Sequence, residues 1–421
     1  MQNSGRPVSN AGEAAEKAIL KTQQDHGSGV PTSSAAQTSL DPALDPASFP
    51  DGGLRAWLTV GGCFCAWFVS FGWMQSVGVF QAYYERKELR TYSHDEIAWI
   101  TSLVAFWQLA GGLIVGPLTD RLGPRIPLII GTVMHSGLLA DRHGVDLLPA
   151  IACVVSWFHK KRGLALGIAA AGSGAASVII PLVVRSMILD QGFPWTMRTC
   201  AFLILFMGTI ACLTCTSRLP PTPKGSPKAI VLASLKDKKF VFMAISGPFN
   251  YLGQYLVFTF IVTTAIYRNV DPDWAFYLVP ISNASGIFGR IILGYLADRT
   301  GAITMFNYSC LLTFLSVACV WIPVSGKAGS IVFALLFGFG SGAMLAMGAA
   351  AIAAVSDPRQ IGIRTGIAYA LAGVVTLFGS PAGGAIINSS GYRAMQAFTQ
   401  PALECVWCLR YMSGISLVGG I

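Results

Sequence analysis

One polar stretch occurs twice in this chain, as GPLTDRLGPR at residues 116–125 and as GYLADRTG at residues 294–301. Each copy follows a long apolar run, and the second begins 178 residues after the first (294 minus 116). Glycine lets helix ends approach closely, and the adjacent Asp and Arg can pair at a surface. Repetition of one polar turn at equivalent places is typical of a duplicated helical unit. The two stretches therefore predict two related helical bundles.

The composition indicates a lipid environment. Hydrophobic residues make up 53% of the 421 residues and charged residues only 12%, about half the share in an average soluble protein. The mean hydropathy is +0.58 over the whole chain. Because the apolar side chains exceed what a globular core can bury, we exclude a soluble multidomain protein.

Nine stretches are long enough to cross a bilayer as helices, since a span needs about 20 residues. The stretch 274–297 is interrupted by one charge, Arg290. The other eight contain no Asp, Glu, Lys or Arg: 56–84, 97–119, 163–184, 199–217, 240–267, 302–326, 328–356 and 365–392.

Two regions are shorter than a full complement of spans requires. Residues 126–158 lie between two basic loops and should cross twice. As a helix they reach about 50 Å, whereas two crossings need about 60 Å and a turn. Glu404 and Arg410 interrupt the C-terminal run. We therefore predict an all-α membrane protein, a twelve-helix bundle in two pseudo-symmetric six-helix halves, with spans three, four and twelve shortened.

The basic residues predict the orientation and the domains. Six of the 29 Lys and Arg residues lie in 218–239, which places this loop and the N-terminus in the cytoplasm. Because the net charge of +9 is spread over short loops, nucleic-acid binding is not expected. The expected organisation is a disordered cytoplasmic tail (1–50), an N-terminal half (51–217), a cytoplasmic linker (218–239) and a C-terminal half (240–421).

The sequence contains no signature of an enzyme, a metal site or a cofactor site. Cys212 and Cys215, like Cys405 and Cys408, have the spacing of metal or redox pairs, but no His lies near either pair. We therefore expect these thiols to pack as small apolar groups. HExxH, GxSxG and P-loop motifs are absent from the sequence, so any pumping must use a gradient.

The repeated turn resembles the signature of the major facilitator superfamily. Further stretches resemble its monocarboxylate porter family, the last two in particular the fungal branch: DGGLRAW (51–57), Phe80 and Tyr84 with WITS (99–102), KKRGLALG (160–167) and NASGIFGR (283–290). The resemblance covers about residues 51–395 and implies alternating access, in which the two halves rock about a central site. It also implies that the two turns latch the cytoplasmic side, with these gating residues: Asp120, Arg121, Arg125, Asp298 and Arg299.

Two positions depart from that family. By alignment, Gln75 stands where the animal lactate carriers have a proton-coupling Lys, and Gly286 stands where they have an acid one turn before the span-eight Arg. The resemblance therefore does not imply lactate-type proton coupling.

Arg290 is the sharpest candidate for substrate binding. A cation inside a span costs roughly 2.5–3.5 kcal/mol on insertion scales, so it is usually paired, solvated or functional. Its guanidinium could hold a carboxylate through two hydrogen bonds, or it could reach the cytoplasmic surface as an anchor. Arg185, near the outer interface, is expected to be an anchor.

Neutral polar side chains in spans one, seven and eight could line a cavity, or could join helices by hydrogen bonds. With Arg290 and Tyr251, the predicted substrate pathway comprises Gln75, Asn250, Gln254, Tyr255 and Asn283. Asn388 is the one glycosylation sequon that could approach the lumen.

We therefore expect a secondary-active transporter of a small organic acid or carboxylated metabolite, with a proton as the coupling ion. The alternatives are an exporter of a fungal secondary metabolite and a non-transporting or truncated homologue. The expected partners are the lipid bilayer and a small-molecule substrate, and the expected location is the plasma membrane.

Overall fold

The structure, a computed structural model, describes residues 45, 48–83, 91–92, 94–138, 148–218, 227–358 and 360–412. The chain divides into two compact units, Met1–Ser48 and Phe49–Ile421. In the first unit, the Ser48 hydroxyl donates a hydrogen bond to the carbonyl oxygen of Asp45. The expected disordered tail, residues 1–50, therefore lies almost entirely outside the described residues.

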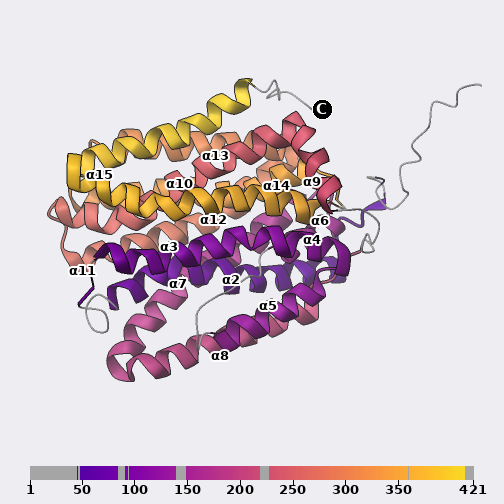
Figure 1. Cartoon of the computed structure of the whole chain (residues 1–421), viewed down its shortest axis with the longest axis horizontal. Coiled ribbons are helices and arrows are strands. Elements are labelled where there is room, and N and C mark those ends of the chain that lie inside the picture. Colours follow the sequence, from indigo (N-terminus) through magenta and orange to yellow (C-terminus); the bar gives the residue numbers. More distant parts are fainter. Residues whose placement is uncertain are drawn as a thin grey trace, which may run out of the picture. The chain divides into compact units, whose positions relative to one another are not determined.

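The second unit is built from helices that run along a common direction (Figure 1). Its N-terminal half contains α2 (Leu54–Tyr83), α3 (His94–Ala110), α4 (Gly112–Leu122), α5 (Arg125–Leu138), α6 (Leu148–Trp157), α7 (Arg162–Asp190) and α8 (Gly192–Thr214). After α9 (Pro227–Lys236), the C-terminal half contains α10 (Lys238–Tyr267), α11 (Pro272–Ala275), α12 (Leu278–Thr300), α13 (Ala302–Ser316), a π-helical turn (Val317–Trp321), α14 (Gly326–Ala354) and α15 (Ile361–Met412). Helix α15 comprises two helices, because Gly391 interrupts it with a φ of 81°.

Nine helical stretches of the described residues are long and apolar enough to cross a membrane, which confirms the nine predicted spans. The predicted shortening between them is confirmed as well. Within the described residues, helix α5 has 14 residues and α6 has 10, so both fall below the length that a full crossing needs. Residues 139–147, which join them, lie outside the described residues.

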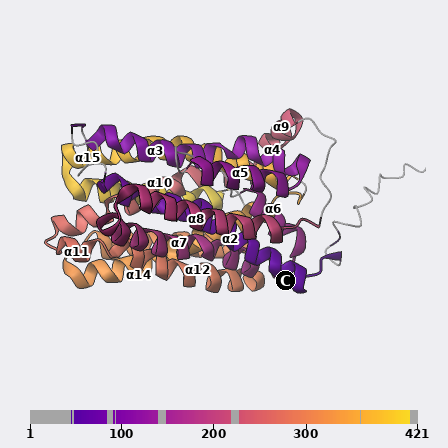
Figure 2. The ribbon, with the colours of Figure 1, turned by 90° about the horizontal axis from the view of Figure 1, so that it is seen from below.

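The same packing scheme occurs in both halves. Helix α2 packs along α7, and α10 packs along α15. Two further contacts join the halves, one between α12 and α7 and the other between α15 and the α3–α4 pair; Figure 2 shows α3 beside α15. Small residues permit these crossings, since a Cβ added at Gly167 would lie 2.3 Å from the carbonyl oxygen of Arg290.

The end of the predicted linker is attached to the C-terminal half. Asp237 caps α10 by accepting hydrogen bonds from the N–H groups of Lys239 and Phe240, at 3.1 and 3.5 Å. Its other carboxylate oxygen lies 3.0 Å from Arg364 Nη1 on α15. The boundaries of the halves, 51–217 and 240–421, stay predictions.

Candidate functional site

The C-terminal copy of the repeated turn contacts the beginning of α7. Asp298, near the end of α12, accepts hydrogen bonds from the Gly163 N–H at 2.6 Å and the Leu164 N–H at 3.0 Å. These N–H groups belong to the first helical turn, where the helix itself supplies no acceptor. A Cβ added at Gly294 would lie 2.6 Å from the Gly163 carbonyl oxygen, so the backbones are in close contact. These four residues form what we call the Asp298 junction.

The N-terminal copy makes the equivalent contact with α15. Asp120, near the end of α4, accepts hydrogen bonds from the Gly362 N–H at 3.1 Å and the Ile363 N–H at 2.9 Å. A Cβ added at Gly116 would lie 2.2 Å from the Gly362 carbonyl oxygen. These four residues form the Asp120 junction. Each junction therefore joins a repeated turn of one half to a helix N-terminus of the other half.

The junctions give each Asp a partner that the sequence did not indicate. The sequence allowed the adjacent Asp and Arg to pair at a surface, and in the structure both carboxylates bind backbone N–H groups of the opposite half. A carboxylate is favoured there because a helix N-terminus carries partial positive charge. Arg121 and Arg125 are exposed, and Arg299 lies over the Tyr295 ring with 4.7 Å between guanidinium carbon and centroid.

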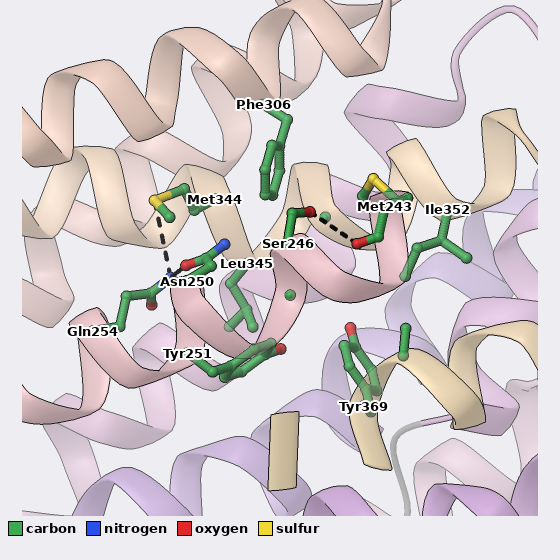
Figure 3. A pocket seen from close by; sticks show the side chains of 13 residues that line it. Met243, Ser246, Asn250, Tyr251, Gln254, Phe306, Met344, Leu345, Ile352 and Tyr369 are labelled. Atoms are coloured by element: carbon green, nitrogen blue, oxygen red, sulfur yellow. Dashed lines mark hydrogen bonds between the residues drawn. The ribbon is translucent and has the colours of Figure 1, made fainter. Parts of the chain in front are cut away.

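Asn250 and Gln254 line a pocket within the C-terminal half (Figure 3). Gln254 Nε2 donates a hydrogen bond to Asn250 Oδ1 at 2.6 Å and lies 3.9 Å from Met344 Sδ. The Tyr251 and Tyr369 rings pack edge to face, with centroids 5.8 Å apart. The full lining comes from α10, α13, α14 and α15: Met243, Ser246, Gly247, Asn250, Tyr251, Gln254, Phe306, Met344, Leu345, Gly348, Ile352, Ala368 and Tyr369.

This pocket offers aromatic, thioether and amide groups but is small. Its cavity volume is about 30 Å³, which suits one or two water molecules. An organic substrate needs a cleft of about 300 Å³ or more. The pocket must therefore widen before it can hold such a molecule.

Arg290 lies apart from this pocket, at the contact between α12 and α7. Its side chain is only 2% exposed, and Nε and Nη1 have no hydrogen-bond partner within the described part of the chain. A Cβ added at Gly174 of α7 would lie 2.1 Å from Nη1, so the guanidinium packs directly on that helix. The alternative of an anchor at the cytoplasmic surface is wrong for this structure, because the side chain is buried.

The remaining predicted residues do not join one site. Asn283 is buried about two turns before Arg290 on α12 and donates a hydrogen bond to the Val279 carbonyl oxygen at 3.1 Å. A Cβ added at Gly379 of α15 would lie 3.6 Å from the Tyr255 ring, so Tyr255 faces that helix. Gln75 belongs to α2, but its side chain lies outside the described part. Asn388 is exposed on α15, and its glycosylation stays a prediction.

The structure reveals a contact between the halves that the sequence did not predict. Arg185, at the end of α7, lies 3.4 Å from Asp273 of α11 and 4.8 Å above the Phe276 ring. The sequence showed only that Arg185 lies near the end of a span. Because that position is also typical of a membrane anchor, it did not indicate a contact between the halves.

A second arginine was not singled out at all. Arg268, just after α10, donates hydrogen bonds to the carbonyl oxygens of Trp321, Val324 and Ile322, and to Gln396. It thereby holds the ends of three helices together. Only its position in a loop was visible in the sequence.

Known fungal proteins resemble most of the chain. It is 41% identical over 377 residues to MFS-type transporter 1 from Ophiocordyceps sp., covering 84% of each chain. It is 38% identical over 372 residues to the fujikurins efflux protein of Gibberella fujikuroi, covering 83% of this chain and 80% of that protein.

Two further comparisons agree with this similarity. Residues 143–336 match the family model described as Major Facilitator Superfamily. The crystal structure of the human organic anion transporter MFSD10 (TETRAN) covers 84% of this chain and 97% of its own, with a TM-score of 0.65 at 13% identity. That likeness concerns the fold alone.

The chain belongs to the major facilitator superfamily, and it is a multi-pass membrane protein with the all-helical fold of these transporters. The predicted fold class is thereby confirmed, as is the superfamily.

Proposed function

We propose that this protein is a secondary-active exporter of a fungal secondary metabolite that carries an acidic group. The observation that carries the proposal is the similarity to a fungal efflux protein over at least four fifths of both chains. This is the alternative that the sequence left open. The main expectation from the sequence, a transporter of a small organic acid or carboxylated metabolite with the direction of transport left open, has less support.

The pocket chemistry supports a substrate larger and more apolar than lactate. Asn250 and Gln254 offer neutral amides, while Phe306, Tyr251 and Tyr369 offer aromatic surface. Ligand sites for organic molecules combine mostly apolar walls with a few polar groups that orient the ligand. Widening of this pocket would provide such a site.

Arg290 is proposed as the contact for the acidic group. A buried guanidinium with unsatisfied N–H groups favours an anionic partner, because an unpaired buried charge is costly. When α12 and α7 separate, Arg290 would face the space between the halves. It would then bind a carboxylate or an enolate with charge-assisted hydrogen bonds.

The proposed mechanism is alternating access. The two junctions hold the halves together where the repeated turns end, and the Arg185 contact joins them at the other end of α7. Release of the junctions would open one side, and release of Arg185 the other. We propose that a proton gradient drives this cycle, and that transport, not catalysis, is the activity.

The location follows from the same proposal. Export requires the plasma membrane, with the N-terminus and the junctions on the cytoplasmic side. We also propose that the chain belongs to the monocarboxylate porter branch. Asp51 in the first of the similar stretches supports this, because its carboxylate accepts hydrogen bonds from the N–H groups of His159 and Lys160, both at 2.7 Å. The contact joins two of the stretches that carry the resemblance.

Transport in inside-out vesicles tests the proposal. Vesicles from a yeast host that produces the full chain would be given a pH gradient and a panel of radiolabelled carboxylates, acidic secondary metabolites and their methyl esters. We expect gradient-dependent accumulation of acidic metabolites. Arg290→Met should reduce it about tenfold to a hundredfold, because a hydrogen bond to a charged group contributes about 1.5–3 kcal/mol.

Two controls make the result specific. Arg290→Lys keeps the charge and should retain part of the activity, while Arg198→Met removes an arginine that stacks on Trp195 within α8 and should change nothing. Equal transport of acids and esters by Arg290→Met and the parent protein would refute the anion contact. Failure to move any compound would instead favour the non-transporting homologue, for which the short α5 and α6 are the structural reason.

A further inference from the structure

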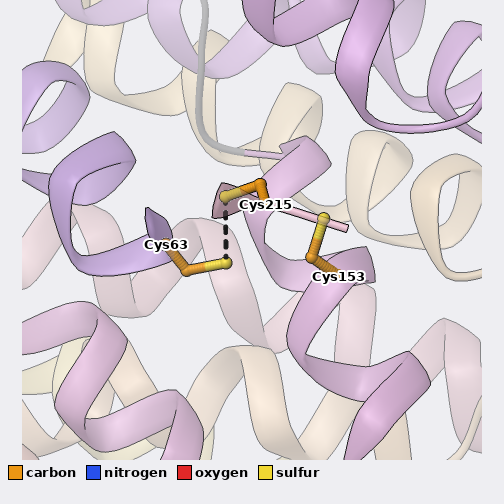
Figure 4. A group of neighbouring side chains, drawn as sticks. All are labelled: Cys63, Cys153 and Cys215. Carbon is orange, nitrogen blue, oxygen red and sulfur yellow. Dashed lines mark hydrogen bonds between the residues drawn. The ribbon is translucent and has the colours of Figure 1, made fainter. Parts of the chain in front are cut away.

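Three cysteines far apart in the sequence meet inside the N-terminal half. Cys63 lies on α2, Cys153 on α6, and Cys215 directly after α8. Their three Sγ atoms all lie within 4.8 Å of one another, and those of Cys63 and Cys215 are 3.6 Å apart (Figure 4). The spacing of Cys212 and Cys215 suggested a pair along the chain, whereas Cys212 instead contacts Thr132.

The cluster is sealed from solvent, since all three cysteines have an exposed fraction of 0%. The Cys63 thiol donates a hydrogen bond to the Ala150 carbonyl oxygen at 3.3 Å. Because that uses its proton, Cys215 is the donor in the contact between the two sulfurs. When all three cysteines are protonated, the Cys63 proton is therefore directed at the Ala150 carbonyl oxygen and the Cys215 proton at the Cys63 sulfur.

We propose that Cys63, Cys153 and Cys215 form a binding site for one Cu(I) ion. Three sulfurs at about 2.3 Å from a common metal, the length of a metal–thiolate bond, are about 4.0 Å from one another. The observed sulfur separations, from 3.6 Å to less than 4.8 Å, bracket that value. The side chains therefore need only small rotations to surround an ion.

The donor set selects the metal. Thiolate sulfur is a soft ligand that favours Cu(I) and Zn(II) among biological cations. Zn(II) prefers four ligands, with water at the fourth position where protein groups do not supply it. This site offers three fully buried sulfurs, which suits Cu(I) better.

The surroundings can accommodate the charge of bound thiolates. The positive charge of Arg125 acts on both Cys153 and Cys215. Binding releases thiol protons to solvent and brings in the positive charge of the ion, so the net charge at the cluster changes less than the number of thiolates suggests. Cys215 lies in the extended segment that follows α8, and displacement of this segment would provide an entry path.

Bound Cu(I) would join α2, α6 and the end of α8, and thus stiffen one half without bridging to the other. The site is therefore distinct from the substrate pathway, and its test is independent of transport. Stabilisation by a ligand that binds only the folded state follows from mass action.

The test uses the full chain in detergent, with Cys405→Ser and Cys408→Ser as background to remove the other closely spaced pair. Anaerobic titration with Cu(I) against a chromogenic Cu(I) chelator would give stoichiometry and affinity, and thermal unfolding would be followed in parallel. We expect one tightly bound Cu(I) and a raised midpoint of unfolding. Cys63→Ser, Cys153→Ser and Cys215→Ser should each lower the Cu(I) affinity on the order of 100-fold. Loss of a residue that only hydrogen-bonds a metal ligand already costs about 10- to 100-fold, and loss of the ligand itself should cost at least as much.

Cys212→Ser is the matched control, since it removes a thiol of α8 three residues before Cys215 that lies outside the cluster, and it should bind Cu(I) like the background protein. Variants would be compared only after size-exclusion chromatography shows that they are folded. Equal loss in Cys212→Ser would overturn the proposal, and so would failure of the folded background protein to retain Cu(I). Recovery of that protein with two thiols fewer, as a Cys63–Cys215 disulfide, would also overturn it.

Discussion

The Asp120 and Asp298 junctions share one geometry but differ in their electrostatic surroundings. In each, a carboxylate accepts two backbone hydrogen bonds at a helix N-terminus of the opposite half. The positive charge of Arg162 acts on Asp298, where it opposes the influence of Asp51. Asp120 is instead repelled by the like charge of Asp357.

At Asp298 the two neighbouring side-chain charges oppose each other, whereas at Asp120 the neighbouring charge of Asp357 is repulsive. Neutralising Asp298 therefore removes a repulsion from Asp51 together with an attraction to Arg162, whereas neutralising Asp120 removes the repulsion from Asp357. The glycine contacts, by contrast, are similarly close at both junctions, since an added Cβ would lie 2.2–2.6 Å from the facing glycine carbonyl oxygen in each case. Symmetric packing is therefore combined with asymmetric electrostatics.

Replacing the glycine at the helix N-terminus of either junction by alanine should have the largest effect on hydrogen exchange. A Cβ at Gly362 would lie 2.5 Å from both the Gly116 carbonyl oxygen and Asp120 Oδ1, and one at Gly163 would lie 2.5 Å from the Gly294 carbonyl oxygen. Since overpacking costs about 1–3 kcal/mol, Gly362→Ala and Gly163→Ala should each increase hydrogen exchange in the first turn of the altered helix about 5- to 100-fold. Exchange would be measured by mass spectrometry on peptides covering 361–366 and 162–167.

Gly384→Ala is the control for these variants, because a Cβ at this position of α15 meets no atom within 4 Å. If it changed exchange as much as Gly362→Ala, the steric explanation would fail. If only one of the two glycine variants increased hydrogen exchange, the two junctions would differ in stability despite their similar packing.

Neutralising the carboxylates should have an intermediate and unequal effect. Loss of a helix-capping charge costs about 1 kcal/mol, which corresponds to about fivefold faster exchange of the capped N–H groups. We expect Asp298→Asn to come near this value at residues 163–164, where the charges of Arg162 and Asp51 oppose each other, and Asp120→Asn to fall below it at residues 362–363, where relief of the repulsion from Asp357 offsets part of the loss. The same peptides provide the measurement, and the reverse order would contradict the role given to Arg162 and Asp357.

Removing the Arg185 contact should have the smallest effect. The two side chains are 40% and 88% exposed, so the pair contributes at most about 1 kcal/mol and is screened by salt. Arg185→Gln should raise exchange in 271–278 less than fivefold at low salt, and hardly at all at 1 M salt. Arg198→Gln serves as the comparison, and an effect that persists at high salt would indicate a packing role instead.

Much of the fold was predictable because spanning a membrane is a local property of the sequence. The charge-free stretches coincide with long helices, and the 126–158 segment is short for two crossings whatever it packs against. The repeated GxLxDR turn likewise marked two equivalent places. Asn250 and Gln254, four residues apart on one helix face, were predicted together and do share a pocket.

The partners of these groups could not be predicted, because they belong to distant segments. Nothing in residues 116–125 indicates that Asp120 binds the N–H of Gly362, and nothing near Cys63 indicates Cys153 or Cys215. Hydropathy indicates whether a segment can span the membrane, and residue spacing indicates which residues lie on the same face of its helix. Which backbone N–H a carboxylate reaches, and which thiols meet, depends on how the helices cross, and that is decided by side-chain and glycine packing across the whole bundle.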